Sequence, residues 1–151
     1  MSVITHYFAY GSNMNPERVA SRGLIIESAG RGELQDYRLL FDKVAKDHPD
    51  TGHANVEFCR DAVTQGVLYK MVEPEEILKM DPFERAPWNY GREVVSVRHA
   101  EGNTWAWTYF ANPAVRKAGL YPSEEYLDHL LAGRSFLSDD YVQMLLAYRQ
   151  R

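Results

Sequence analysis

Four consecutive residues near the start of the chain, Tyr10, Gly11, Ser12 and Asn13, have the composition of an anion-binding turn. A glycine turn between a strand and a helix leaves backbone N–H groups unpaired and pointing the same way, where they can bind an anion. The sequence lacks the glycine fingerprints of dinucleotide-binding proteins, phosphate loops and serine hydrolases. The alternative interpretation is a simple turn with a helix cap and no chemical role.

A second segment, residues 81–90, holds the acid Glu84 among aromatic side chains and between two prolines. Its composition is too irregular for a helix or a strand. A carboxylate beside aromatic walls loses solvation, which raises its pKa and makes it a better base at neutral pH. The alternative is a surface glutamate paired with Arg85 or Arg92.

The other residues with chemical potential are predicted to have structural roles. The five histidines show no ligand spacing, so we expect no metal ion. Cys59 is the only cysteine and lies in a strand pattern, which predicts a buried thiol and excludes an internal disulfide. Trp105 and Trp107 are predicted core residues. Tyr126 lies on the apolar face of a predicted helix, where its hydroxyl needs a polar partner if it is buried.

Strands and helices must position these candidates, and the periodicity predicts where they lie. The first strand covers residues 7–10, directly before the glycine turn. Asn15 followed by Pro16 predicts the N-cap and first residue of a short helix that ends at Gly23. A further short helix is predicted over residues 73–81. Alternation of apolar and polar residues predicts strands over residues 37–42, 53–58, 67–71, 92–99 and 104–111.

The last third of the chain changes to helical spacing. Ser123 and Ser138 are predicted N-caps of two helices, and Gly133 is a predicted C-cap glycine between them. Strands and helices do not alternate one by one along the chain. This order predicts an α+β fold with a largely antiparallel sheet and excludes a doubly wound parallel sheet.

Composition sets limits on the function. The 151 residues correspond to one domain, 1–151, and the apolar and charged fractions, 45% and 25%, are those of a globular protein. A net charge of −4 argues against binding to nucleic acid but leaves room for a local basic pocket that takes a small anion. The N-terminus lacks a secretory signal, and no run approaches the roughly 20 apolar residues of a membrane helix, so we expect a cytoplasmic protein without membrane contact.

Several of these segments together resemble the gamma-glutamylcyclotransferase-like family. The resemblance rests on the run from Tyr7 to Met14 and on Glu84 within residues 81–90. It extends to residues 36–39, 66–71 and 122–127, and the order and approximate spacing are kept over nearly the whole chain.

The resemblance implies a small mixed, largely antiparallel β-barrel flanked by helices, with a pocket at one end. It also implies an enzyme that needs no cofactor. A γ-glutamyl amide is cut by its own α-amine, which gives 5-oxoproline and a free amine or amino acid. Glu84 would act as general base, and the loop from Tyr10 to Asn13 would hold the glutamyl group through backbone N–H donors. Tyr90 and Tyr126 would line the pocket. The partner is thus a small γ-glutamyl molecule, and the resemblance sets no oligomeric state.

One departure from the family pattern concerns the leaving-group side of the pocket. Many members have glycine directly after the acid, where this chain has Arg85. Candidates for the wall around the leaving amine are Arg85, Trp88, Tyr109 and Tyr121. Two alternative functions remain at this stage: a binding module that has lost turnover, and a hydrolase in which Glu84 activates water and releases free glutamate.

Overall fold

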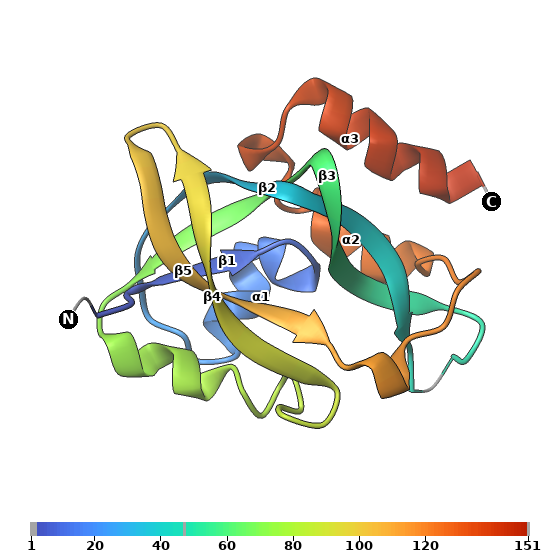
Figure 1. Ribbon diagram of the computed structural model, residues 1–151, viewed down its shortest axis with the longest axis horizontal. Coiled ribbons are helices and arrows are strands. Elements are labelled where there is room, and N and C mark those ends of the chain that lie inside the picture. The colour runs from blue at the N-terminus through green and yellow to red at the C-terminus, as the bar shows by residue number, and fades with distance from the viewer. Residues whose placement is uncertain (1–2, 47, 151) are drawn as a thin grey trace.

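A closed barrel of five strands forms the centre of the computed structural model, which describes residues 3–46 and 48–150 (Figure 1). Both ends of the expected domain 1–151 therefore lie outside the described residues. Around the barrel the strands follow the order β1-β3-β2-β4-β5. Neighbours pair antiparallel except for β1 and β5, whose parallel contact closes the barrel. The predicted α+β fold with a mixed, largely antiparallel barrel is confirmed. The strands are β1 (His6–Ala9), β2 (Ile26–Val44), β3 (Gly52–Met71), β4 (Tyr90–His99) and β5 (Gly102–Ala111).

Two long strands, β2 and β3, replace three shorter ones that the alternation predicted. Residues 53–58 and 67–71 belong to the single strand β3, and β2 begins well before the predicted residue 37. The reason is a set of β-bulges that interrupt the two-residue period. Asp36 and Asp61 both have positive φ, 65° and 69°, and the Asp61 N–H donates to the Asp36 carboxylate. An extra residue at a bulge moves the following side chains to the other face, so the apolar pattern breaks within a continuous strand.

The helices begin where their predicted caps lie. The Asn15 side chain accepts a hydrogen bond from the Glu17 N–H, and Ser123 and Ser138 cap the two later helices in the same way. The predicted helix over 73–81 is a 3₁₀ helix, η2. None of the described helices is long and apolar enough to cross a membrane. The helices are η1 (Ser12–Met14), α1 (Pro16–Ser21), η2 (Pro74–Lys79), η3 (Pro113–Val115), α2 (Glu124–Leu131), η4 (Arg134–Phe136), α3 (Asp139–Leu146) and η5 (Ala147–Gln150).

Two predicted C-cap glycines differ in what the structure requires of them. Gly23 ends α1 with φ of 86°, a left-handed conformation that favours glycine, as predicted. Gly133 has φ of −95° and is not a left-handed cap, so that prediction is wrong. A Cβ at Gly133 would lie 2.7 Å from the Met14 carbonyl oxygen. Glycine is therefore needed there because α2 ends directly against η1, and this contact helps to hold the glycine turn in place.

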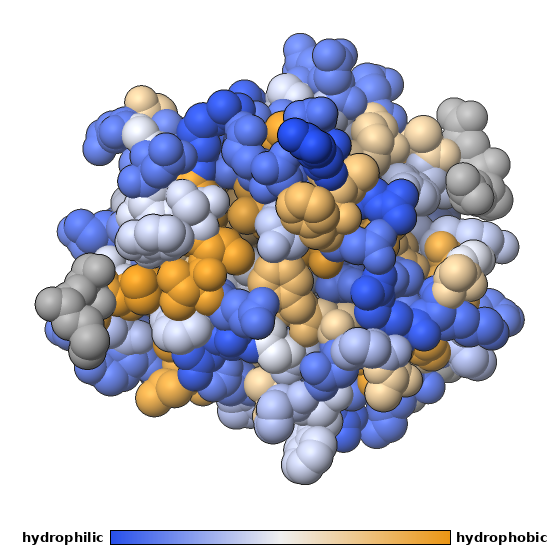
Figure 2. All heavy atoms as spheres, in the orientation of Figure 1, coloured by the Kyte–Doolittle hydropathy of each residue, from blue (hydrophilic) through white to orange (hydrophobic). Residues whose placement is uncertain are grey.

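The outer face of β5 explains why some predicted core residues lie at the surface. Ala106 and Thr108 point into the barrel, whereas Trp105 is 56% exposed and Trp107 is half-buried against the Arg92 guanidinium. Cys59 is also only half-buried. The core prediction is wrong for Trp105, and Trp107 and Cys59 are only partly buried, because large apolar side chains can cover the outside of a strand. Hydrophilic residues occupy much of the face seen in Figure 2, with smaller apolar patches between them.

Candidate active site

A small cavity lies at the end of β1, where the chain turns into η1. It has a volume of about 30 Å³, enough for one or two water molecules. It adjoins a larger pocket of about 210 Å³, which we call the mouth, and four residues line both: Ser12, Glu84, Tyr90 and Tyr126. The structure brings all the predicted site residues together around the cavity: Tyr10, Gly11, Ser12, Asn13, Glu84, Tyr90 and Tyr126.

The glycine turn is held against the cavity by close packing. A Cβ at Gly11 would lie 3.0 Å from the Tyr126 hydroxyl oxygen and 3.1 Å from the Cβ of Ala54. The Tyr10 hydroxyl donates to the Tyr109 carbonyl oxygen and so points to the barrel wall. Tyr10 therefore contributes a wall of the cavity, while its hydroxyl already has a protein partner.

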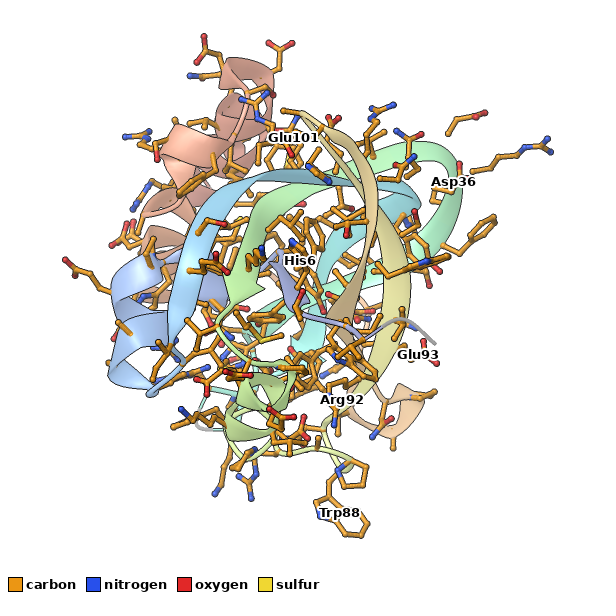
Figure 3. The ribbon with its side chains drawn as sticks, turned by 90° about the vertical axis from the view of Figure 1, so that its left-hand side faces the viewer. His6, Asp36, Trp88, Arg92, Glu93 and Glu101 are labelled. Carbon is orange, nitrogen blue, oxygen red and sulfur yellow. The ribbon has the colours of Figure 1, made fainter. Side chains whose placement is uncertain are left out.

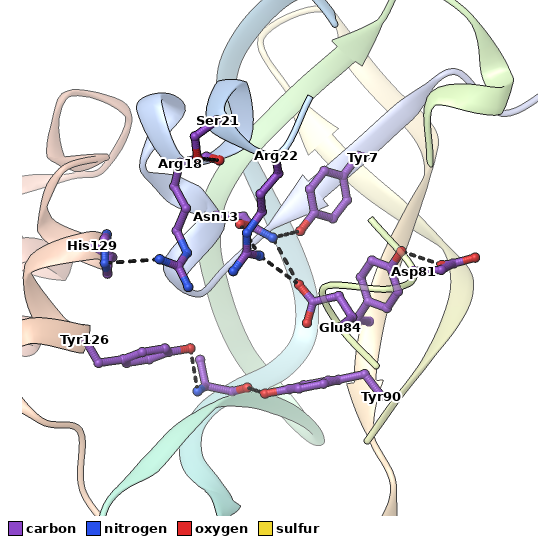
Figure 4. A network of polar contacts seen from close by, with 12 residues as sticks. Tyr7, Asn13, Arg18, Ser21, Arg22, Asp81, Glu84, Tyr90, Tyr126 and His129 are labelled. Carbon is purple, nitrogen blue, oxygen red and sulfur yellow. Dashed lines mark hydrogen bonds and ion pairs between the residues drawn. The ribbon is translucent and has the colours of Figure 1, made fainter. Parts of the chain in front are cut away.

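Tyr90 and Tyr126 are fixed by the backbone of a single residue. The Tyr90 hydroxyl donates to the Ala54 carbonyl oxygen at 2.8 Å, and the Tyr126 hydroxyl accepts from the Ala54 N–H at 2.9 Å (Figure 4). Burial raises the pKa of the Tyr126 hydroxyl to about 12, and backbone hydrogen bonds from Ala54 and Ser12 limit this rise. Both tyrosines are therefore neutral at physiological pH and rigidly oriented on the cavity wall. The Tyr126 hydroxyl also has the polar partner that its burial requires.

Glu84 lies in a network of polar contacts inside the cavity (Figure 4). The Asn13 side-chain amide donates to the Glu84 carboxylate at 3.0 Å and to the Tyr7 hydroxyl at 2.8 Å. Arg22 donates to the side-chain oxygen Oδ1 of Asn13 at 3.0 Å and approaches the Glu84 carboxylate at 3.9 Å. The Glu84 side chain is only 17% exposed, and its ion pair is with Arg22, so the alternative of a surface glutamate paired with Arg85 or Arg92 is wrong.

Two acids three residues apart have opposite electrostatic environments. Burial raises the pKa of Glu84, and the opposing effects of Arg22, Arg18 and the Asn13 hydrogen bond do not cancel it. Asp81 is also partly desolvated, but hydrogen bonds from Arg92 and Tyr109 lower its pKa below the ordinary value. Two carboxyl groups whose pKa values are shifted in opposite directions can act in different protonation states. Glu84 is fitted to accept a proton, whereas Asp81 stays ionised.

Asp81 anchors the segment that carries Glu84. The Tyr109 hydroxyl donates to the Asp81 carboxylate at 2.6 Å, and Arg92 makes a two-pronged contact with the same group at 3.0 Å. Because Arg92 lies on β4 and Tyr109 on β5, these bonds tie the irregular segment 81–90 to the barrel. The acid is thus positioned by rigid strands although it lies on a loop.

The four candidates for the leaving-group wall separate into two groups. Arg85 lines the mouth, and Tyr109 lines the cavity beneath it. Trp88 is 77% exposed and projects away from the barrel (Figure 3). Tyr121 is also exposed and lines neither the cavity nor the mouth. The last two predictions are therefore wrong, since an aromatic type in a nearby segment does not fix the direction of its side chain.

Sequence reasoning missed the cations around Glu84. Arg18 and Arg22 come from α1 and its C-cap, and Lys43 comes from the end of β2. The one available signal was the spacing of the two arginines, which four residues apart share one face of a helix. No local pattern linked Lys43 to the site, because the barrel alone brings β2 beside the acid.

Comparisons with known proteins identify the family and the fold of this chain. The family model for gamma-glutamyl cyclotransferase, AIG2-like proteins matches residues 7–128. The solved structure of YkqA from Bacillus subtilis superposes with a TM-score of 0.83 at 21% identity, over 98% of this chain and 54% of that one. The chain thus spans about half the length of YkqA.

Two further solved structures superpose with a TM-score of 0.77, over 95% of this chain and 86% of each of theirs. One is a gamma-glutamyl cyclotransferase at 23% identity, and the other is an uncharacterized protein from Homo sapiens at 25% identity. A search of curated protein sequences gave no match. At these identities the superpositions show the shared fold, and the family model covers most of the chain. The chain therefore belongs to the gamma-glutamyl cyclotransferase, AIG2-like family.

Proposed function

We propose that this chain is a cyclotransferase that cleaves the γ-amide bond of a γ-glutamyl substrate and releases 5-oxoproline. The observation that carries the proposal is the position of Glu84: a largely desolvated carboxylate with a raised pKa, beside the glycine turn and between the small cavity and the mouth. Membership of the family supports the same reaction class.

The reaction uses one proton acceptor and no water. The neutral α-amine of the substrate attacks the γ-carbonyl carbon, and a five-membered ring closes as the new C–N bond forms. Glu84 takes a proton from the attacking nitrogen and returns it to the nitrogen of the leaving amine. The bond from the γ-carbon to that nitrogen then breaks, so the products contain all the atoms of the substrate. General acid–base catalysis of this kind contributes about 10²–10⁴-fold.

Positioning supplies a second large contribution. Both reacting groups belong to one molecule, and holding them in an attack geometry is worth on the order of 7–11 kcal/mol in the best oriented intramolecular reactions. The glutamyl group would lie against the turn from Gly11 to Asn13, and the neutral hydroxyls of Tyr90 and Tyr126 border this position. Cyclisation is favoured over hydrolysis because the attacking amine is part of the bound substrate, whereas water is a separate reactant.

The test is the identity of the product. The purified protein is incubated with a panel of γ-glutamyl amino acids and γ-glutamyl amines, and 5-oxoproline and glutamate are quantified by mass spectrometry. We expect 5-oxoproline in equal amount to the released amine. Glutamate as the product would show a hydrolase, and saturable binding without any product would show a binding module. Either result contradicts the proposal.

A further inference from the structure

The mouth of the site contains a buried lysine, Lys43. Lys43 is only 6% exposed, and within residues 3–46 and 48–150 its ammonium makes no ion pair and no hydrogen bond. It lies over the ring of Tyr90, 6.0 Å from the ring centre. Lysine is rarely buried without a partner, because desolvation of an ammonium is expensive. Burial and the nearby Arg85 both lower the pKa of Lys43, and the attraction of Glu84, which makes no ion pair with it, does not cancel this effect.

Other cations share this pocket. Arg18, Arg22, Lys46 and Arg85 line the mouth with Lys43, and Glu84 is the one acid among the described residues that line it. Arg22 is the cation that pairs with that acid, and within the described part of the chain the other four cations make no ion pair. The buried Nε of Arg18 has no hydrogen-bond partner in the described part of the chain. The mouth is therefore strongly positive, although the whole chain carries a net charge of −4.

The pKa of His53 is affected by the same positive charges. Burial lowers its pKa to about 4, and Lys43 and Arg18 contribute to the shift. Its ring stacks on Tyr126 with the ring centres 4.5 Å apart. His53 is therefore neutral at physiological pH, and the positive charge of the mouth comes from the lysines and arginines.

Arg85 occupies a backbone conformation that L-residues adopt only at a cost. Its φ is 53°, in the left-handed region, and its carbonyl oxygen accepts from the N–H groups of Trp88 and Asn89 at 2.8 and 2.9 Å. Strained conformations of this kind occur where the residue serves a function. Here the strained residue is a cation that faces the mouth directly after the catalytic acid.

We propose that Lys43 and Arg85 bind a carboxylate on the leaving group, so that this chain prefers γ-glutamyl amino acids and peptides to γ-glutamyl amines without that carboxylate. The inference rests on the proposed function. The glutamyl part must reach the cavity, where the glycine turn and Glu84 lie, and the mouth begins where the cavity ends. The portion of the substrate that occupies the mouth is therefore the leaving group. A carboxylate there would supply the ion-pair partner that Lys43 lacks among the described residues.

The test compares γ-glutamyl-alanine with γ-glutamyl-alaninamide, which differ only in the leaving-group carboxylate. We expect kcat/KM to be about 10- to 100-fold higher for the acid, the range of a hydrogen-bonded charge pair, with most of the difference in KM. Lys43→Met should reduce this ratio towards 1. Arg85→Gly should reduce it by about 3- to 10-fold and should fold normally, because glycine suits a left-handed position. Lys117→Met, which removes an exposed lysine elsewhere, should keep the wild-type ratio.

Three results would overturn the proposal. One is a wild-type ratio near 1, and another is a ratio that both variants leave unchanged. The third is an equal loss for both substrates in Lys43→Met, accompanied by sensitivity to amidation of the glutamyl α-carboxylate, which would place Lys43 on the glutamyl group. If neither compound yields 5-oxoproline, the proposed function fails by itself. Calorimetric binding of the same two compounds then decides the inference: tighter binding of the acid that Arg85→Gly weakens supports it, and equal binding refutes it.

Discussion

The two ends of the barrel carry pockets of very different size and character. Beyond the start of β1, a groove of about 800 Å³ is lined by His6, Glu33, Lys70 and Arg98 among others. At the end of β1, the cavity around Glu84 measures only about 30 Å³. In the groove, Glu33 is paired with Arg98 at 2.9 Å, and both side chains keep contact with solvent. At the other end Glu84 and Lys43 are largely desolvated, and Lys43 makes no ion pair with any described residue.

We infer from this contrast that a ligand site is better indicated by desolvated charges without an ion-pair partner than by the volume of the pocket. A solvated ion pair contributes about 0–1 kcal/mol and has no need of a further partner. A buried carboxylate with a raised pKa is less stable in its ionised form than in water, and it becomes useful only when it takes a proton from something bound beside it.

The largest expected effect comes from removing the proton acceptor. Glu84→Gln keeps the shape of the side chain and its contact with Asn13 but abolishes its basicity. We expect kcat to fall about 10²–10⁴-fold. The matched change at the opposite end, Glu33→Gln, should leave kcat within about twofold of wild type, because it removes only a surface ion pair. Steady-state kinetics on one γ-glutamyl substrate measures both, and equal effects would remove the distinction between the two ends.

A second comparison concerns the arginines that face these acids. Arg22 lowers the pKa of Glu84, so Arg22→Met should raise that pKa and move the acid limb of the kcat profile to higher pH. At neutral pH kcat/KM should fall about tenfold, the order expected for a lost charge-assisted hydrogen bond to Asn13. Arg98→Met, at the groove, should shift neither quantity. If the acid limb of the kcat profile has the same position in Arg22→Met as in wild type, the limb does not reflect the titration of Glu84.

Two glycines allow the packing at the two ends of the barrel to be compared. Gly11→Ala would force a Cβ against the Tyr126 hydroxyl and Ala54 and should lower the free energy of unfolding by about 1–3 kcal/mol. Gly30→Ala, in the groove, meets no atom within 4 Å and should change stability by less than about 0.5 kcal/mol. Urea denaturation followed by fluorescence measures both variants. A tolerated Gly11→Ala would contradict the close packing of the turn.

The smallest effect is a gain in stability in Glu84→Gln. Burial raises the folded-state pKa of Glu84 above its unfolded value, so its ionisation disfavours the folded state. Wild type should therefore lose stability relative to the variant as the pH rises from near the unfolded pKa of about 4.5 through the folded one. Thermal unfolding at several pH values should show a gain that grows over this window and then levels off. A gain that shrinks with rising pH would contradict the raised pKa.

Local features of this fold were predictable from the sequence, and features set by strand pairing were not. The caps at Asn15, Ser123 and Ser138 were correctly predicted because each depends on a side chain and a backbone group two or three residues away. The lengths of β2 and β3 were not, because the bulge at Asp36 and Asp61 joins residues far apart in the chain and breaks the alternation.

The residues of the candidate site also include some that the sequence could indicate and some that it could not. The glycine turn and Glu84 could be identified because each has a distinctive local composition, and the structure places them around one cavity. Arg18 and Lys43 could not, because in the sequence a lone cation is indistinguishable from a solvated one. Only closure of the barrel removes water from Lys43 and brings it beside the acid.

The most direct test of the central claim follows a labelled atom. A γ-glutamyl-alanine carrying ¹⁵N at the glutamyl α-amine is incubated with wild type and with Glu84→Gln, and the products are analysed by mass spectrometry. We predict ¹⁵N in the ring of 5-oxoproline, an equal amount of unlabelled alanine, and loss of both products in the variant. Labelled glutamate from the wild type, or undiminished 5-oxoproline from Glu84→Gln, would contradict the assignment of cyclisation to this end of the barrel.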